Sequence, residues 1–324
     1  MFIKDNIYGE FEIEEPILIE LINSKPVQRL KGIIQQVIPT RFQRFPWFTR
    51  YEHSIGVMLL LRKLGATIEE QVSGLLHDVS HTAFSHMIDM LLYNDLDENF
   101  QDKNHENIIK NSEIPKILEN YNFDVNKISN PANFSLLEQP APDLCADRVD
   151  YCLRDMYYWA NPEKVNFCIS NLINNEGKII FNNKEAAKEF ALSYHKCQKE
   201  RWGSVDENVR CFIFVQALNE ALKQNLIKFE DFYKDDNYIM KILEKSDNAR
   251  IIKIFKLLEG NIKYEIEENK PEFIIKKKFR YVDPIYIENN IIYKLSKIDK
   301  DYNNLMNVEN KKLEEIKVKF KDVI

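Results

Sequence analysis

The sequence predicts a mainly α-helical protein: a helical bundle with a short N-terminal β segment and a small C-terminal α/β appendage. Helical patterning runs from about residue 17 to residue 260. Only eight glycines and eleven prolines occur in 324 residues, which argues against a large β-rich protein. Runs of β-branched and aromatic residues gather near the two ends. We therefore expect a helical domain at residues 1–258 and an α/β subdomain at residues 259–324.

The first elements can be placed in order along the chain. The segment FIKDNIYGEFEI predicts the β opening, and RYEHSIGVMLLLRKLG predicts a helix that carries His53 and ends at Gly65. Thr67 and Glu70 predict a capping box for a following helix, EEQVSGLLHD, which presents His77 at its C-terminal end. Antiparallel helices with so short a link bring His53 near His77 if their pitches agree.

The next segment, HDVSHTAFSHMIDMLL, predicts a helix on which His81, His86 and Asp89 lie within about 140° of one another. A polar stretch at 129–143 interrupts the helical pattern, and the helix DLCADRVDYCLRDMYYW follows it.

Beyond residue 260 the pattern changes. The runs at 263–269, 276–287 and 290–296 are typical of strands, and a charged helix is predicted at 305–320.

Four residues have the chemistry of a divalent metal site, because imidazole nitrogens and carboxylate oxygens are common metal ligands. They are His53, His77, Asp78 and Asp147. The helix face around Asp147 also fits an ordinary solvated surface with local ion pairs. Four of the six histidines occupy residues 53–86, however, and this clustering favours a site. The spacing of His77 and His81 is also that of zinc metalloproteases, but the required glutamate is replaced by Asp78.

Together YEHSIG, GLLHDVSHTAFSH, a later NHE and ADRVDYCLRD resemble the HD-domain phosphohydrolases, specifically the branch that contains dNTP triphosphohydrolases. The resemblance covers most of residues 1–215 and returns at 276–299. It implies an HD-domain helical bundle. It also implies an enzyme that hydrolyses dNTPs to deoxynucleoside and triphosphate with a metal-activated water.

The resemblance assigns His53, His77, Asp78 and Asp147 to one divalent metal ion: Mn²⁺, Fe²⁺ or Mg²⁺, with Zn²⁺ or Ni²⁺ as alternatives. It implies a catalytic group that surrounds the scissile phosphate, made of His81, His86, Asp89, His105 and Glu106. Within this group His105 would be the general acid, supported by Glu106 and Asp89. Spacing alone favours a polar helix start with His105 in solvent, and the match to the family overturns this interpretation.

The resemblance also implies substrate-binding residues: Gln35, Arg50, Arg148, Tyr151, Asp155 and Trp202. The two arginines, with His81, would clamp phosphate oxygens. Gln35, Tyr151 and Asp155 would read the 3′ side of the sugar, and Trp202 would form an aromatic wall. As alternatives, Gln35 and Tyr151 are helix-surface residues and Trp202 is a core residue.

The chain departs from this family where an arginine that grips the distal phosphates is expected, because Tyr194 stands there. This departure keeps a second function open, a phosphomonoesterase acting on nucleoside monophosphates or other small phosphates. A third is a non-catalytic regulator that binds nucleotide or nucleic acid.

Global properties indicate a cytoplasmic protein. Five cysteines form no CxxC pair and are odd in number, which fits a reducing compartment. The apolar run VMLLL is far too short to span a bilayer, and no N-terminal signal is apparent. A net charge of -6 gives no field that favours nucleic acid. The expected partners are a nucleotide or other small phosphorylated substrate and, from the resemblance, further copies of the chain.

Overall fold

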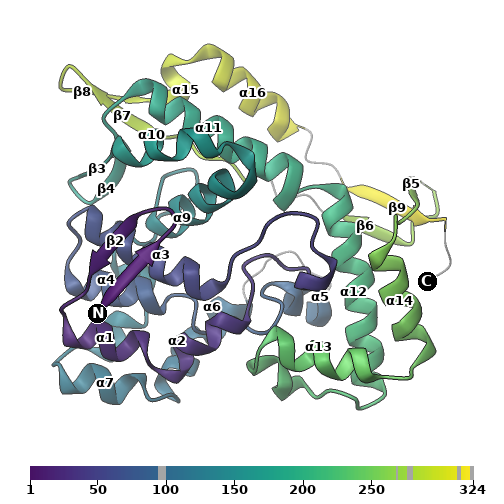
Figure 1. Cartoon of the computed structure of the whole chain (residues 1–324). Coiled ribbons are helices and arrows are strands. Elements are labelled where there is room, and N and C mark those ends of the chain that lie inside the picture. The colour runs from purple at the N-terminus through teal and green to yellow at the C-terminus, as the bar shows by residue number, and fades with distance from the viewer. Residues whose placement is uncertain (94–99, 268, 276–279, 312–314, 322–324) are drawn as a thin grey trace.

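The structure is a computed structural model that describes residues 1–93, 100–267, 269–275, 280–311 and 315–321. Helices dominate the described residues, which confirms the predicted mainly α-helical class (Figure 1). The helices up to residue 170 are α1 (Pro16–Ile22), α2 (Lys25–Arg29), α3 (Arg50–Lys63), α4 (Ile68–Leu76), α5 (Met87–Tyr93), α6 (Phe100–Lys110), α7 (Ile114–Asn120), α8 (Val125–Ile128), α9 (Ala146–Asp155) and α10 (Val165–Ser170). The later helices are α11 (Lys184–Cys197), α12 (Val205–Lys223), α13 (Asp236–Lys245), α14 (Ala249–Glu259), α15 (Leu295–Ile298) and α16 (Lys300–Lys311).

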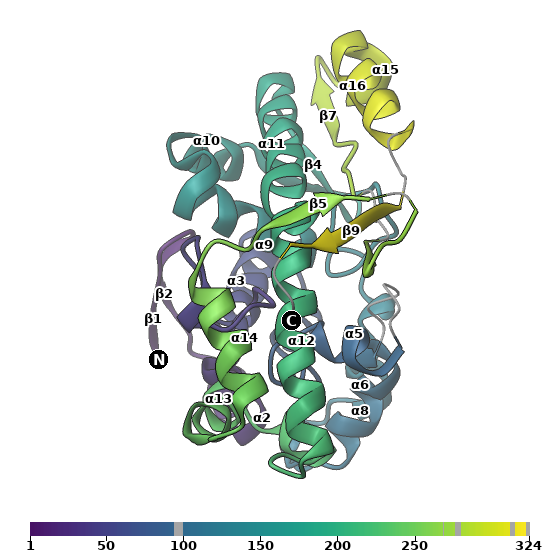
Figure 2. The same cartoon turned by 90° about the vertical axis from the view of Figure 1, so that its right-hand side faces the viewer.

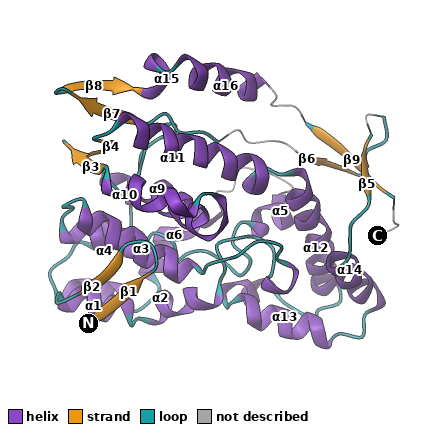
Figure 3. Cartoon of the chain, turned by 45° about the horizontal axis from the view of Figure 1, so that its top comes forward, coloured by secondary structure: helices purple, strands orange, loops and turns teal. Residues whose placement is uncertain are grey.

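The strands form three small antiparallel or mixed sheets at the margins of the helical body (Figure 3). The predicted N-terminal β segment is the hairpin β1 (Phe2–Asp5) and β2 (Gly9–Glu12). A four-stranded sheet has the order β3-β4-β7-β8, from Leu172–Asn175, Lys178–Phe181, Ile285–Glu288 and Ile291–Lys294. A three-stranded sheet has the order β5-β9-β6, from Tyr264–Ile266, Ile316–Phe320 and Phe273–Ile275.

The chain after residue 260 contributes to two separate sheets. Strand β7 pairs in parallel with β4, a strand from the middle of the chain, whereas β5, β6 and β9 lie beside α12 and α14 (Figure 1). The domain boundary near residue 258 stays a prediction. Residues 276–279 of the predicted strand run 276–287 lie outside the described residues.

The predicted helix at 305–320 is wrong from residue 316 onward, and its residues 312–314 lie outside the described residues. Helix α16 ends at Lys311, and Ile316–Phe320 is the central strand β9. Val318 and Phe320 are buried on one face of this strand, and both neighbouring strands hydrogen-bond to it. The alternation of apolar and charged residues in IKVKF is the two-residue period of a half-buried strand, and it outweighs the charged helical pattern before it.

Helix α3 is the centre of the first of two hydrophobic cores. Every residue from His53 to Leu61 is buried, because α3 is surrounded by α2, α4 and α9. Thr49 and Glu52 form a reciprocal capping box at its start. Gly65 follows its end with φ of +74°, which confirms the predicted stop.

Helix α4 begins as predicted but is capped differently. The Thr67 hydroxyl accepts from the backbone N–H of Glu70. The Glu70 carboxylate instead accepts from the backbone N–H groups of Leu136 and Leu137, so the returning half of the predicted capping box is wrong. The helix ends at Leu76, and His77 with Asp78 lies in the turn that follows.

The predicted helix over 77–92 is wrong up to residue 86, because α5 begins at Met87. Phe84 and Ser85 adopt left-handed backbone conformations, with φ of 61° and 53°. Asp236 on α13 accepts the backbone N–H of Phe84, and the Phe232 carbonyl accepts that of Ala83. These long-range bonds hold the segment out of the helical conformation that its local sequence favours.

The second core is formed by α12, α13 and α14 with α5. Helix α12 runs along the molecule beside α14 (Figure 2). A cavity of about 1010 Å³ is lined by residues from both cores, including His77 and Asp147 from the first half of the chain and Glu207 from α12. No helix in the described part of the chain is both long and apolar enough to cross a bilayer.

Candidate metal centre and active site

Three of the four predicted metal ligands converge beside the cavity, and two of them, His77 and Asp147, line it. His53 comes from α3, His77 from the turn after α4, and Asp147 from the first turn of α9. The two Nε2 atoms are 3.2 Å apart, so the expected proximity of the two histidines is confirmed. Asp147 Oδ1 lies 2.9 Å from His53 Nε2 and 3.6 Å from His77 Nε2. The donor atoms of all three lie within 4.8 Å of one another.

The surroundings of these imidazoles fit a bound cation. His53 Nδ1 lies 2.6 Å from Asp150 Oδ2, and His77 Nδ1 lies 2.7 Å from the Gly74 carbonyl oxygen. Because each Nδ1–H has an acceptor, each neutral ring turns an Nε2 lone pair toward Asp147. Two lone pairs and a carboxylate this close together repel one another unless a proton or a metal ion lies among them.

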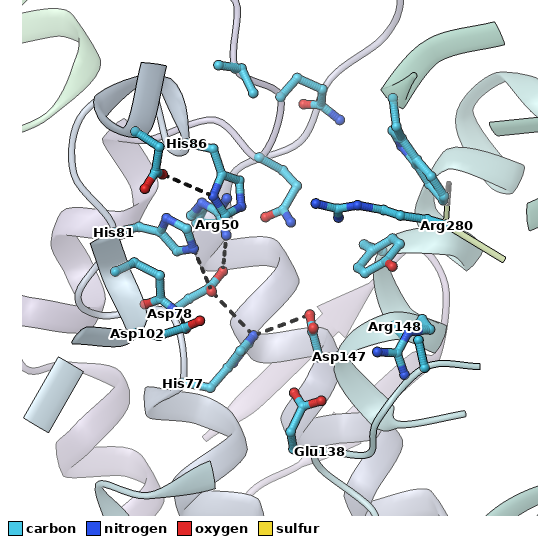
Figure 4. A pocket seen from close by; sticks show the side chains of 18 of the residues that line it. Arg50, His77, Asp78, His81, His86, Asp102, Glu138, Asp147, Arg148 and Arg280 are labelled. Atoms are coloured by element: carbon cyan, nitrogen blue, oxygen red, sulfur yellow. Dashed lines mark hydrogen bonds and ion pairs between the residues drawn. The ribbon is translucent and has the colours of Figure 1, made fainter. Parts of the chain in front are cut away.

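Asp78 lies at the edge of this cluster. Its Oδ1 is 3.4 Å from His77 Nε2, and its Oδ2 is 2.7 Å from Arg50 Nη1 (Figure 4). Oδ2 is 3.9 Å from His53 Nε2. Despite its burial, the neighbouring cation of Arg50 and the imidazoles hold the pKa of Asp78 well below its usual range. Asp78 is therefore a carboxylate, and its role as a ligand stays a prediction.

The electrostatics of the cluster favour positive charge. Burial opposes the charged form of His53, but the hydrogen bonds with Asp147 and Asp150 outweigh it and raise the pKa of His53 to about 9. For His77, too, nearby Asp78 and Asp147 overcome burial and raise the pKa. A site that binds protons this strongly also binds a divalent cation strongly when the proton is lost.

His81 and His86 stand above Asp78, with ring centroids 4.9 Å apart. His81 Nε2 is 3.3 Å from Asp78 Oδ1, and His86 Nδ1 is 3.7 Å from Asp89 Oδ2. Burial lowers the pKa of both histidines, and the cation of Arg50 lowers them further. Both rings are therefore neutral at physiological pH without a bound anion.

His105 also lines the cavity, but its partners differ from those expected. The Ser80 hydroxyl donates to Gln101 Oε1, so at 2.9 Å Ser80 Oγ accepts from His105 Nδ1–H. Asp89 lies beside His86, and the exposed Glu106 carboxylate pairs with Lys110 on its own helix. The expected support of His105 by Asp89 and Glu106 is thus not seen as a hydrogen bond or ion pair among the described residues, although all three side chains line the cavity.

The two arginines that the resemblance assigns to phosphate binding both line the cavity. Arg50 is 2% exposed and donates Nε to Ser85 Oγ and Nη1 to Asp78, whereas Nη2 has no hydrogen-bond partner among the described residues. Arg148 Nη1 donates to the Asp143 carbonyl at 2.7 Å, and both of its terminal nitrogens are near the Gln139 carbonyl. Main-chain oxygens therefore hold Arg148 in place, and Figure 4 shows where its side chain lies in the cavity wall.

The expected sugar-reading residues line another part of the same cavity. Tyr151 and Tyr194 share a hydroxyl–hydroxyl hydrogen bond of 2.7 Å. Asp155 accepts from Arg201 Nη1 and from Trp202 Nε1, each at 2.7 Å, so internal donors engage both of its oxygens. Buried Gln35 Oε1 has no hydrogen-bond partner in the described part of the chain.

Sequence reasoning missed several residues that shape the site. Asp150, which holds His53, could have been found from its position three residues after Asp147 on one helix face. Glu138 lies beside Asp147, and burial with the Asp147 charge raises the pKa of Glu138 to about 7. Arg280 points into the cavity from the opposite wall (Figure 4), a placement without a local signal because it depends on the path of the C-terminal segment.

The buried neutral histidines predict acid sensitivity of the metal-free protein. Burial lowers the pKa of His105 from 6.5 to about 4, and that of His86 is also lowered. As pH falls, the unfolded chain therefore binds protons before the folded chain does. The contribution of these neutral histidines to the free energy of unfolding is complete above pH 6.5 and is lost toward pH 4. Urea unfolding of chelator-treated protein should show a falling midpoint across this range. His105→Asn should reduce the slope of the urea midpoint against pH. An unchanged slope would contradict the assignment of His105 as a buried neutral histidine.

Comparison with known proteins agrees with this geometry. Residues 50–155 match the HD domain family model. The chain is 40% identical over 296 residues to the uncharacterized protein YdhJ of Bacillus subtilis, covering 90% of each. It is 41% identical over 155 residues to the metal-dependent phosphohydrolase cns2 of Cordyceps militaris, covering 48% of this chain and 45% of that one. It is 34% identical over 104 residues to the deoxynucleoside triphosphate triphosphohydrolase SAMHD1 of Bos taurus, covering 27% of this chain and 17% of that one. The family match and these relatives agree with the cavity and its potential metal ligands. The chain therefore belongs to the HD-domain phosphohydrolase superfamily and is an HD-type metal-dependent hydrolase.

Proposed function

We propose that this chain hydrolyses a phosphate ester of a nucleotide in the large cavity, with deoxynucleoside triphosphates as the first substrate class. The observation that carries the proposal is a pair of buried nitrogens with no hydrogen-bond partner among the described residues, Arg50 Nη2 and His105 Nε2. Both side chains line the cavity beside the His53, His77 and Asp147 cluster. Buried donors and acceptors are rarely left unpaired, so these two nitrogens indicate a polar ligand such as a phosphate.

The roles of the residues follow from their contacts. His53, His77 and Asp147, with Asp78 adjacent, would hold a divalent cation, which would supply Lewis acidity toward phosphate and would lower the pKa of water. Arg50 is fixed by Ser85 and Asp78, so Nη2 can donate to a phosphate oxygen without reorganisation. Asp78 thereby connects the clamp to the ligand cluster.

His105 is placed to transfer a proton to the leaving oxygen. Its Nδ1–H is held by Ser80, which leaves Nε2 for the substrate. Without substrate the low pKa of His105 keeps Nε2 unprotonated at neutral pH. An anionic phosphate beside Nε2 raises that pKa, so the ring acquires its proton together with the substrate.

The choice of dNTPs is supported by the local similarity to SAMHD1 and by Gln35, whose buried, unpaired Oε1 suits a sugar hydroxyl. Direct contact of Asp155 with the sugar is less well supported, because Arg201 and Trp202 already engage its oxygens. Asp155 would instead hold Trp202 as the aromatic wall.

A second candidate, hydrolysis of a nucleoside monophosphate, is favoured by the charges of the cavity. Its described lining has eight carboxyl side chains but only four arginines. Arg50, Arg148 and Arg201 are among these arginines, and each donates to a protein oxygen. Tyr194 is tied to Tyr151 where the distal phosphates of a triphosphate would need a cation. A phosphomonoester brings less negative charge into this lining than a triphosphate does.

The discriminating experiment is mass-spectrometric identification of products from dNTPs, NTPs and nucleoside monophosphates, with protein loaded anaerobically with Mn²⁺ or Fe²⁺. Release of intact triphosphate supports the first candidate, and orthophosphate from monophosphates supports the second. Tyr194→Arg should increase the use of triphosphates relative to monophosphates if distal charge is limiting. Complete inactivity on the whole panel would contradict both candidates.

A further inference from the structure

We propose that Asp5, in the N-terminal hairpin, is a positioning residue for the metal centre, acting on the ligand His53 through Arg154 and Asp150. Asp5 is the last residue of β1 and lies far from the cavity lining in the chain. Nevertheless its carboxylate belongs to a continuous buried path that ends at His53. The inference rests on the proposed metal site.

The path is made of charged groups in direct contact. Asp5 Oδ2 accepts from Arg154 Nη2 at 2.8 Å, and Arg154 Nε donates to Asp150 Oδ2 at 2.8 Å. The same Asp150 oxygen lies 2.6 Å from His53 Nδ1. Asp150, Arg154 and His53 are at most 1% exposed, and Asp5 is 8% exposed. Solvent therefore screens these contacts weakly.

The charge balance explains why Asp5 affects His53. Arg154 is shared between two carboxylates, so the set of Asp5, Arg154 and Asp150 has one net negative charge behind His53. That charge makes Asp150 a stronger acceptor for the Nδ1–H of His53, and a strong acceptor raises the basicity of a ligating imidazole. Without the Asp5 charge, the guanidinium is drawn entirely to Asp150 and weakens its bond to His53.

The local structure is built around this path. Asp5 Oδ1 accepts the backbone N–H groups of Ile7 and Tyr8, which fixes the hairpin turn relative to the carboxylate. The Tyr8 hydroxyl is buried, and burial together with the Asp150 charge raises its pKa well above the ordinary value. A Cβ on Gly56 of α3 would overlap both Arg154 Nη2 and Asp150 Oδ1. Only glycine leaves room for the path at this point.

The test is the affinity for Mn²⁺ alone, measured by isothermal titration calorimetry on the full chain without substrate. Asp5→Asn keeps an oxygen for the turn but removes the charge, and it should weaken Mn²⁺ binding roughly 10- to 100-fold. Glu10→Gln is the matched control: it removes a charge from the same hairpin, but Glu10 is exposed and its ion pair is with exposed Lys4. It should leave Mn²⁺ affinity unchanged.

A double-mutant cycle separates positioning from damage to the hairpin. In an Arg154→Gln background the path is already broken, so Asp5→Asn should have little further effect on Mn²⁺ affinity. Additive losses, or an unchanged affinity in Asp5→Asn, would overturn the inference. If Arg154→Gln does not fold, Tyr8→Phe provides a second perturbation near Asp150. We expect Tyr8→Phe to lose less Mn²⁺ affinity than Asp5→Asn loses. Equal losses of Mn²⁺ affinity in the two variants would also overturn the inference. If the wild-type chain binds no Mn²⁺, the proposed metal site itself fails.

Discussion

Replacing Asp147 with asparagine is expected to lower metal-dependent phosphate release at least about 10³-fold, because loss of the cation removes several kcal/mol of transition-state stabilisation. Asp147 Oδ1 lies between the two imidazoles, 2.9 Å from His53 Nε2 and 3.6 Å from His77 Nε2. The amide has almost the same shape but no charge. The bound metal per chain, measured by elemental analysis after dialysis, should fall together with activity.

Asp143→Asn is the matched control for this substitution. Asp143 lies shortly before α9, its side chain is 40% exposed, and it is 3.6 Å from the Lys294 ammonium. Exposed pairs of this kind contribute little to stability, so activity and metal content should stay near those of the wild type. If Asp147→Asn instead retains both metal and activity, the assignment of the cluster as the metal centre is wrong.

Replacing His105 with asparagine is expected to lower the rate of nucleotide hydrolysis about 10²- to 10⁴-fold, the usual contribution of a positioned proton donor. A nucleoside alkoxide leaves poorly without a proton, whereas nitrophenolate leaves readily. The loss should therefore be much smaller on a p-nitrophenyl phosphate ester. Mn²⁺ affinity should be retained, because His105 lies outside the ligand cluster and bonds to Ser80.

Glu106→Gln tests the neighbouring residue that the sequence also placed in the catalytic group. Its exposed side chain pairs with Lys110, so a small effect is expected from the structure. Equal losses on both substrates in His105→Asn would argue against proton transfer. Tight nucleotide binding without turnover, unchanged in His105→Ala, would favour the regulator that binds but does not catalyse.

Helices α3 and α4, which position His53 and His77, could be predicted because their signals are local. Gly65 ends α3, Thr67 begins α4, and the spacing of His53 and His77 across so short a link allowed their meeting. The nature of the ligands also pointed to a divalent cation before any geometry was known. These inferences need only backbone preferences and ligand chemistry, which neighbouring residues determine.

Long-range contacts decided what the sequence could not. Asp236, far along the chain, holds Phe84 out of the predicted helix and so turns His81 and His86 toward Asp78. Ser80 lies beside His105 because of the way α6 packs, which the sequence does not show. Strand β9 forms because β5 and β6 pair with it on both sides.

The sequence by itself therefore determined the helical class, the end of α3 and the start of α4, and it predicted which groups would bind a metal ion. The tertiary structure decided which partner holds each buried side chain of the site: Asp150 for His53, Arg50 for Asp78 and Arg201 for Asp155. The physical reason is that a charged side chain buried in a low-dielectric interior must take whichever partner the fold places beside it. That partner can lie anywhere along the chain.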